Sequence, residues 1–259
     1  DLPCFQIRPN LIYANFEFKM VNKQTALAYR IISEPVKKEF YMLIICFIIT
    51  ALVPYLICGI NSAIIVTKIK TGKDIRTMGS GNAGLTNTLR TQGKAAALFV
   101  LIGDVAKGVL SVIFVWLSFK LLAGIDARAV ESEYEWVLYA SGTSAILGHV
   151  FPLYYGFKGG KGVLVTVAVL LAIDWLPAVI LLAIFGAVVA LSKYVSLGSC
   201  IAAFLYPFTV LIFGIIEKSP CFDLNFLFSA LIALMIIFMH RENIKRLKNH
   251  TEKKLGQKK

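Results

Sequence analysis

The feature that most constrains this chain is a series of apolar runs, each about as long as a helix that crosses a bilayer. Such a helix needs about 20 largely apolar residues. Five runs meet this requirement: Phe40–Val66, Ala95–Ala123, Trp136–Phe157, Tyr194–Ile216 and Phe222–Met239. Hydrophobic residues make up 58% of the chain and charged residues only 16%, an excess that one soluble core cannot bury. The sequence therefore predicts an all-α, polytopic integral membrane protein.

A further apolar stretch, residues 163–191, is interrupted by Asp174-Trp175-Leu176-Pro177. A proline inside a helix removes a backbone hydrogen bond, and an aspartate that faces lipid is costly. We therefore predict two short helices, Val163–Ile173 and Pro177–Leu191, joined by a tight turn at the membrane edge. This interpretation gives seven transmembrane helices, and one long kinked helix would give six.

The charges between the apolar runs favour seven helices. In that arrangement one side carries 17 Lys or Arg and three Asp or Glu, in residues 67–94, Lys158–Gly162, Lys193 and the tail after His240. The other side, apart from the N-terminal residues, carries two basic and seven acidic residues, in 124–135, Asp174 and 217–223. Because basic loops stay in the cytoplasm, we predict a cytoplasmic C-terminus and an outside N-terminus. Residues 1–38 are predicted to form an N-terminal extension of unknown role, and residues 39–259 the membrane domain with its short basic tail.

Composition also argues against several other classes. The net charge of +12 is explained by basic cytoplasmic loops, so we do not expect nucleic acid as a partner. Five scattered cysteines without a CxxC pair indicate neither a disulfide framework nor a zinc site. We expect no metal and no cofactor.

The first segment with chemical potential is MGSGNAGLTNTLRTQGK, residues 78–94. Its GxGxxG pattern follows a lysine-rich membrane exit instead of a strand, so it does not predict a dinucleotide site. Glycines nevertheless let backbone N–H groups converge on an anion, and Arg90 offers a planar fork for phosphate. Four neutral polar residues add further hydrogen-bonding groups: Ser80, Asn82, Thr86 and Asn87. We favour anion binding over the alternative of a flexible loop that caps the next helix.

The second segment is GHVFPLYYGFKGGKG, residues 148–162. It is not a P-loop, because Lys161 is followed by Gly162 instead of Ser or Thr. The amides of Gly159, Gly160 and Lys161 are predicted to form a phosphate nest, with the Lys161 ammonium supplying charge. The alternative is a tight basic turn. We interpret His149 as a buried histidine with a local hydrogen-bond partner.

The third segment is HRENIKRLKNHTE, residues 240–252. His240 and Asn243 are three residues apart and share a helix face where the last apolar run ends. Because histidine titrates near neutrality, we favour a site role for this pair over simple interfacial anchoring. Ser199, near the start of the run Tyr194–Ile216, is a further hydroxyl candidate, although we favour an ordinary helix start as its explanation. Asp104 and Lys107 are predicted to pair in the bundle interior, in either a structural or a functional role.

Together, GSGNAGLTNTLR, GHVFPLYYGFKGGKG and HRENIKRL resemble the three motif regions of the bacterial membrane acyl-phosphate:glycerol-3-phosphate acyltransferases. The resemblance extends from about Met42 to Glu252. Leu85 departs from the family's usual Ala, and residues 58–61 depart from its GSIP-like end of the first span. The resemblance implies transfer of a fatty acyl group from acyl phosphate to the 1-hydroxyl of sn-glycerol 3-phosphate, which gives lysophosphatidic acid and phosphate and begins phospholipid synthesis. It also implies a bacterial inner-membrane location, with the active site at the cytoplasmic face.

The resemblance further implies residue roles. The catalytic candidates are His240, Lys161 and Ser80. The substrate-binding candidates that it implies are Arg90, Asn243, Thr86, Gly159 and Gly160. Three more substrate-binding candidates come from the residue patterns described above: Asn82, Asn87 and Ser199. The implied partners are both substrates, membrane lipid and the enzyme that makes acyl phosphate. Either His240 or the donor phosphate can accept the proton. The alternative function is a membrane transporter of an organic phosphate or other small anion, against which we weigh the lack of an internal repeat.

Overall fold

The computed structural model describes residues 23–217 and 223–257, and it describes side chains from residue 37 onward except that of Ser132. It divides into two compact units, Asp1–Met42 and Leu43–Lys259. In the first unit, the described residues belong to helix α1, which begins at Lys23 and continues into the second unit as far as Gly59. The predicted extension 1–38 lies in part outside the described residues.

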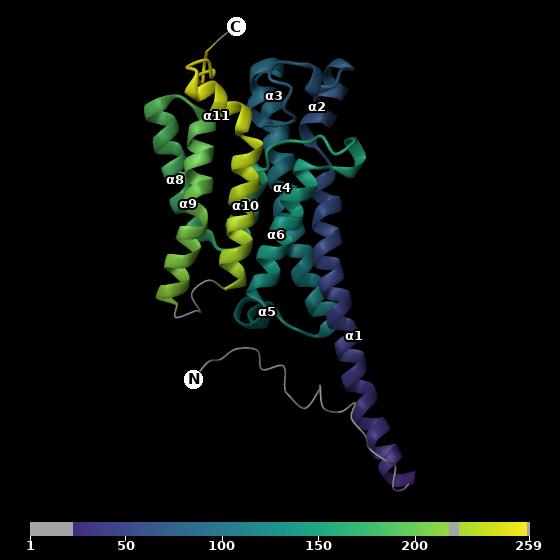
Figure 1. The fold of residues 1–259 in the computed structure, drawn as a ribbon. Helices are drawn as coiled ribbons and strands as arrows, with labels where there is room; N and C mark the ends of the chain where they lie inside the picture. Colours follow the sequence, from purple (N-terminus) through teal and green to yellow (C-terminus); the bar gives the residue numbers. More distant parts are fainter. Residues whose placement is uncertain (1–22, 218–222, 258–259) are drawn as a thin grey trace. The chain divides into compact units, whose positions relative to one another are not determined.

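Every regular element that the structure describes is helical, which confirms the predicted all-α class (Figure 1). After α1 the order is α2 (Ser62–Thr71), η3 (Ile75–Thr77), α3 (Leu85–Gln92), α4 (Lys94–Ser118), η4 (Phe119–Ala123), α5 (Ala127–Glu133), α6 (Glu135–Val150), η5 (Leu153–Tyr155), α7 (Val163–Ile173), α8 (Trp175–Ser192), α9 (Val195–Ile216), α10 (Leu224–Met239) and α11 (Arg241–Lys248). The start of the predicted run at Phe222 lies outside the described residues.

By length and composition, four helical segments among the described residues can cross a membrane. They are Lys37–Thr71, Lys94–Ala123, Trp175–Ser192 and Val195–Ile216. A fifth is obtained if α10 and α11, which meet at 56°, count as one broken span. Helices α6 and α7 are shorter, so the membrane character is clear while the count of seven stays a prediction.

The first predicted run is not one helix. Helix α1 ends at Gly59 and α2 begins at Ser62, with Asn61 between them in an extended conformation. The Asn61 side chain accepts a hydrogen bond of 3.0 Å from the amide of Ile64. Asparagine is favoured at this N-cap position because its side chain satisfies an amide of the first turn that has no partner within the helix. The run 40–66 is therefore broken at residues 60–61, although Lys37–Thr71 still qualifies as one candidate membrane span.

The break near Asp174 follows the prediction more closely. Helix α7 ends at Ile173 and α8 begins at Trp175, so the stretch is two helices and not one kinked helix. The second helix begins two residues before the predicted start at Pro177. Proline is tolerated in a first turn because the amides there have no acceptor within the helix.

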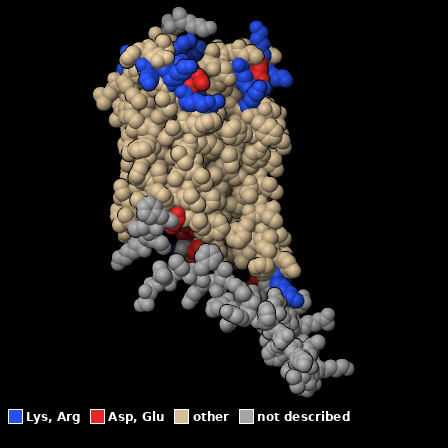
Figure 2. Space-filling view, in the orientation of Figure 1, with Lys and Arg blue, Asp and Glu red and all other residues tan. Residues whose placement is uncertain are grey.

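Within Leu43–Lys259, neighbouring helices pack in antiparallel pairs such as α8 with α9 and α9 with α10, and α4 packs against α7 (Figure 1). The ends that carry α2, α3 and α11 lie on one side of this unit, and α5 lies on the other (Figure 1). Lys and Arg side chains gather around the former end, whereas Asp and Glu appear near the latter (Figure 2). Between them the visible face of this unit is almost free of charge. The structure therefore groups the charges in two sets, as the sequence predicted.

Candidate active site

The first glycine-rich segment is shaped by Asn87, a buried residue of α3. Its side-chain nitrogen donates to the carbonyls of Met78 and Asn82 at 2.9 and 3.0 Å, and its oxygen accepts from the amide of Ser80 at 2.9 Å. A Cβ at Gly79, where φ is +58°, would collide with this side chain. Asn87 was predicted to bind substrate, but here its amide group holds the loop in shape.

Three other polar side chains of this segment do not hold the loop in shape as Asn87 does. The hydroxyls of Ser80 and Thr86 and the side-chain amide of Asn82 form no hydrogen bond to any residue the structure describes. Ser80 is exposed, and Asn82 and Thr86 are half-buried. These three groups are therefore available to a ligand, and their contact with substrate stays a prediction.

The second glycine-rich segment crosses the end of α6. The amide of Gly159 donates to the carbonyl of Val150 at 3.0 Å, and the amide of Gly160 donates to the carbonyl of His149 at 3.1 Å. These amides are already paired, so they do not form the open phosphate nest that the sequence predicted. The physical reason is that the free carbonyls at the end of α6 need donors, and the glycine amides supply them.

Close packing explains why glycine is needed at Gly160. A Cβ there would lie 2.7 Å from the carbonyl oxygen of Ala83 and would collide with the ring of His149. Ala83 belongs to the first glycine-rich segment, and Gly160 to the second. The two segments, about 80 residues apart in sequence, therefore meet at a point with no room for a side chain.

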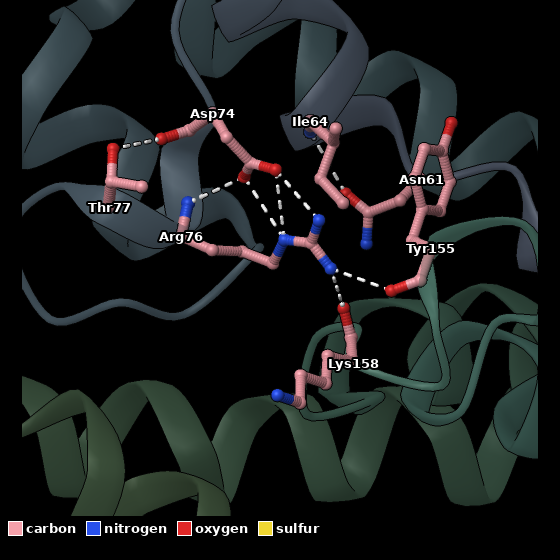
Figure 3. Close-up of polar contacts among 7 residues, drawn as sticks. All are labelled: Asn61, Ile64, Asp74, Arg76, Thr77, Tyr155 and Lys158. Atoms are coloured by element: carbon pink, nitrogen blue, oxygen red, sulfur yellow. Dashed lines mark hydrogen bonds and ion pairs between the residues drawn. The ribbon is translucent and has the colours of Figure 1, made fainter.

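Arg76 also joins these two segments (Figure 3). Its guanidinium donates to the carbonyls of Tyr155 and Lys158 at 2.8 and 3.0 Å, and it pairs with both carboxylate oxygens of Asp74. Hydrogen bonds from Arg76 hold the pKa of the Asp74 carboxyl below its usual value. Arg76 was not among the predicted site residues, although the sequence shows an Asp-x-Arg triplet, residues 74–76, just before the glycines. An open hollow lies beside the Asp74–Arg76 pair. Its lining residues are Asp74, Arg76, Thr77, Gly81, Tyr155, Gly156, Lys158 and Gly159.

The third segment meets the second through Lys161. The Lys161 ammonium donates to the side-chain oxygen of Asn243, which is buried in α11. The Asn243 nitrogen donates to Glu252 at 2.7 Å. Glu252 also accepts hydrogen bonds from Ser196 at 2.9 Å and from Arg246 at 2.7 Å. One buried carboxylate thus links α9, α11 and the tail that follows it.

Glu252 and Ser196 were not among the predicted site residues. An acidic residue within a lysine-rich tail was the only signal for Glu252 in the sequence. Ser199 was the predicted hydroxyl of α9, but its side chain donates to the carbonyl of Val195 in its own helix, at 3.0 Å. Any contact of Ser199 with substrate therefore stays a prediction.

Charges at this end of the bundle favour an anionic ligand. Burial lowers the pKa of Lys161 from 10.5 to about 8, with the nearby charge of Arg246 lowering it further and that of Glu252 opposing the change. Burial alone would raise the pKa of Glu252, but hydrogen bonds from Arg246, Asn243 and Ser196 outweigh it and the pKa is lowered. Among the described residues Lys161 forms no ion pair, and its ammonium donates a hydrogen bond to the neutral side-chain amide of Asn243. A phosphate would supply the missing negative charge.

His240 and Arg90 complete the group of predicted candidates. His240 is 4% exposed, and its Nδ1 lies 2.8 Å from the carbonyl oxygen of Ile236. Because a carbonyl can only accept, Nδ1 carries the hydrogen, and Nε2 of the neutral ring is an acceptor. Arg90 is exposed and donates to the carbonyl of Lys253 at 3.1 Å, so α3 contacts the C-terminal tail. Contacts thus link all three predicted segments at one end of the unit.

Known proteins are similar to this chain in sequence and in fold. The family model for glycerol-3-phosphate acyltransferase matches residues 48–250. A glycerol-3-phosphate acyltransferase of Clostridioides difficile (strain 630) is 41% identical over 218 residues, which are 84% of this chain and 100% of that protein. One of Coxiella burnetii (strain CbuG_Q212) is 37% identical over 210 residues, covering 81% of this chain and 98% of that protein.

A solved structure agrees with these relatives. The glycerol 3-phosphate form of PlsY (YgiH), described as an integral membrane glycerol 3-phosphate acyltransferase, superposes with a TM-score of 0.67. It is 30% identical, and the match covers 81% of this chain and 96% of that one. The family match covers the first two segments and the third as far as residue 250, and the relatives match over most of both chains, so the chain belongs to the glycerol-3-phosphate acyltransferase family.

Proposed function

We propose that this protein transfers a fatty acyl group from acyl phosphate to the 1-hydroxyl of sn-glycerol 3-phosphate, without a cofactor. Acyl transfer to glycerol 3-phosphate is the activity for which the family is named. The observation that carries the proposal is Lys161, a half-buried cation that has no ion pair among the described residues and is held by Asn243 at the meeting point of two segments. Both proposed substrates are phosphates, and either can supply the missing charge.

The donor determines what the site must do. An acyl phosphate is a mixed anhydride, so the hydroxyl oxygen can attack the acyl carbon directly, and the bond to phosphate breaks as the tetrahedral oxyanion collapses. Lys161 and Arg90 would neutralise the phosphates, and Ser80, Asn82 and Thr86 would donate or accept hydrogen bonds. The proton of the attacking hydroxyl has two acceptors available, namely Nε2 of His240 and the donor phosphate itself. Precise orientation of the two reactants then supplies much of the rate.

The donor can be tested with purified protein. Palmitoyl phosphate and palmitoyl-CoA are compared as donors to glycerol 3-phosphate, and release of phosphate is measured with and without the acceptor. We expect turnover with palmitoyl phosphate to exceed that with palmitoyl-CoA by orders of magnitude, because only in the former is the bound anion the leaving group. Lys161→Ala should abolish turnover. Lys158→Ala is the matched control, since the Lys158 side chain is exposed and forms no hydrogen bond among the described residues. Equal kcat/KM for both donors would contradict the proposed donor.

The alternative function needs its own measurement. A transporter of organic phosphate would accumulate labelled glycerol 3-phosphate in sealed vesicles that contain the protein. We expect no accumulation without an acyl donor. Accumulation combined with no acyl transfer by the purified protein would favour the transporter.

We further propose seven transmembrane helices in the bacterial inner membrane, with the N-terminus outside and the C-terminus and active site cytoplasmic. The segregation of basic and acidic side chains supports this orientation (Figure 2). Single-cysteine labelling in intact cells tests it: cysteines placed at Lys158 and Asn249, both exposed, should be protected from an impermeant reagent. External labelling at residue 158 with protection at residue 249 would contradict seven helices. At the cytoplasmic face, the enzyme that makes acyl phosphate would be a natural partner.

Residues 1–38 hold no site candidate. We therefore propose that they are dispensable for turnover.

A further inference from the structure

A buried ammonium lies beneath the meeting point of the two glycine-rich segments. Lys107 of α4 is only 6% exposed. Its nitrogen lies 2.9 Å from a carboxylate oxygen of Asp104, 2.9 Å from the carbonyl oxygen of Ile60 and 3.0 Å from Nδ1 of His149. The contacts with Ile60 and His149 are hydrogen bonds, and the contact with Asp104 is an ion pair. Asp104 and Lys107 are thus paired in the bundle interior, as the sequence predicted.

Two of the three acceptors lead directly to the candidate active site. Ile60 precedes Asn61, whose side-chain nitrogen donates to the carbonyl of Ala83 at 3.3 Å. The carbonyl of His149 accepts a hydrogen bond from the amide of Gly160. A Cβ at Gly160 would also collide with the His149 ring. Ala83 and Gly160 are themselves the point of contact between the segments. Lys107 therefore contacts Ile60, whose neighbour Asn61 bonds to the first segment, and His149, which bonds to the second.

We propose that Lys107 is a positioning residue of the acyltransferase reaction, which sets the spacing between the two glycine-rich segments through Ile60 and His149. It does not touch substrate, and its own charge is balanced by Asp104. The consequence is that Lys161, which directly follows Gly160, stands at the correct distance from the first segment. Small displacements of groups that orient reactants cost large factors in rate. This inference rests on the proposed function.

The competing explanation is that the Asp104–Lys107 pair only stabilises the bundle. A double variant, Asp104→Leu with Lys107→Met, distinguishes the two, because replacing a buried ion pair by apolar groups of similar size is often neutral for stability. We expect the variant to keep a thermal unfolding midpoint close to that of the wild type. If Lys107 positions the segments, KM for glycerol 3-phosphate should rise, and kcat should fall, by about tenfold or more. Wild-type kinetics in a stable double variant would overturn the proposal.

Two further variants complete the experiment. His149→Leu removes the contact between Lys107 and α6 but leaves the ion pair intact, so it should raise KM in the same direction. Ser111→Ala is the control: its hydroxyl is buried and donates to the carbonyl of Lys107 at 2.7 Å, yet it contacts neither glycine-rich segment. Its kinetics should match those of the wild type. Failure of both the double variant and His149→Leu to fold would assign the network to stability and overturn the proposal. If neither the wild type nor Ser111→Ala transfers an acyl group to glycerol 3-phosphate, the result would instead contradict the proposed function.

Discussion

Asn243 donates a hydrogen bond of 2.7 Å to Glu252, while its carbonyl oxygen accepts one from Lys161. Each end of the amide therefore faces a group of the matching kind, a carboxylate at the nitrogen and an ammonium at the oxygen. Glu252 lies nine residues after Asn243, in the tail that follows α11. Although it is so near the C-terminus, this tail belongs to the candidate site, since its carboxylate orients the residue that holds Lys161.

Glu252→Gln should therefore impair the enzyme without removing any group predicted to touch substrate. The glutamine nitrogen cannot accept from Arg246, and hydrogen bonds to a charged group are worth about 1.5–3 kcal/mol. We expect kcat/KM for glycerol 3-phosphate to fall by one to two orders of magnitude. Glu242→Gln makes the same change in charge at an exposed position of α11 and is the matched control. Equal kinetics of the two variants would show that Glu252 has no part in the site.

The lowered pKa of Lys161 predicts a pH dependence. With a pKa of about 8, Lys161 is charged at neutral pH and loses its proton as the pH rises above that value. The charge that binds phosphate is then lost, so kcat/KM for glycerol 3-phosphate should fall about tenfold per pH unit above the pKa. The measurement is kcat/KM from about pH 6 to about pH 10, a range that includes the values at which side-chain amines titrate. The stability of the protein is checked at both ends of this range. A profile that stays flat to its alkaline end would mean that Lys161 is not needed in its charged form.

Arg90→Lys keeps the charge but loses the planar fork. A lysine cannot contact a phosphate at two points and the Lys253 carbonyl as well, and each lost charge-assisted bond costs about 1.5–3 kcal/mol. We expect kcat/KM to fall at least about tenfold. Arg128→Lys, an exposed position in α5, is the control and should leave kinetics unchanged. If both variants behave like the wild type, Arg90 acts only as a surface charge.

Gly160→Ala tests the contact between the two glycine-rich segments. The added Cβ would meet the His149 ring and the Ala83 carbonyl, and neither can move without shifting α6 or the first segment. We expect activity to be almost abolished in protein that still inserts into the membrane. Gly186→Ala is the control, because a Cβ at that helical position meets no atom within 4 Å and alanine is the better helix former. Normal turnover of Gly160→Ala would show that the segments can separate without loss of function.

Much of this molecule follows from local sequence. The apolar runs predicted the helices, and Asp174 with Pro177 predicted the break between α7 and α8, because hydrophobic length and proline act on the residues beside them. The capping role of Asn61 was equally local but was hidden by the apolar residues around it. The three polar segments were also visible, since glycines and cations stand out between apolar runs.

Apart from the Asp104–Lys107 pair, which the sequence predicted, the pairing of polar groups inside the bundle was decided by tertiary structure. Lys161 and Asn243 are 82 residues apart, Lys107 and His149 are 42 apart, and Ser196 and Glu252 are 56 apart. No periodicity or motif links such positions, because the partner of a buried polar group depends on which helix ends pack together. Likewise, the sequence does not show that the amides of Gly159 and Gly160 bond to carbonyls at the end of α6, and only the fold brings these groups together. The sequence by itself determined the helices and the chemical groups available, and only their packing decided that Glu252, Arg76 and Lys107 support the rest.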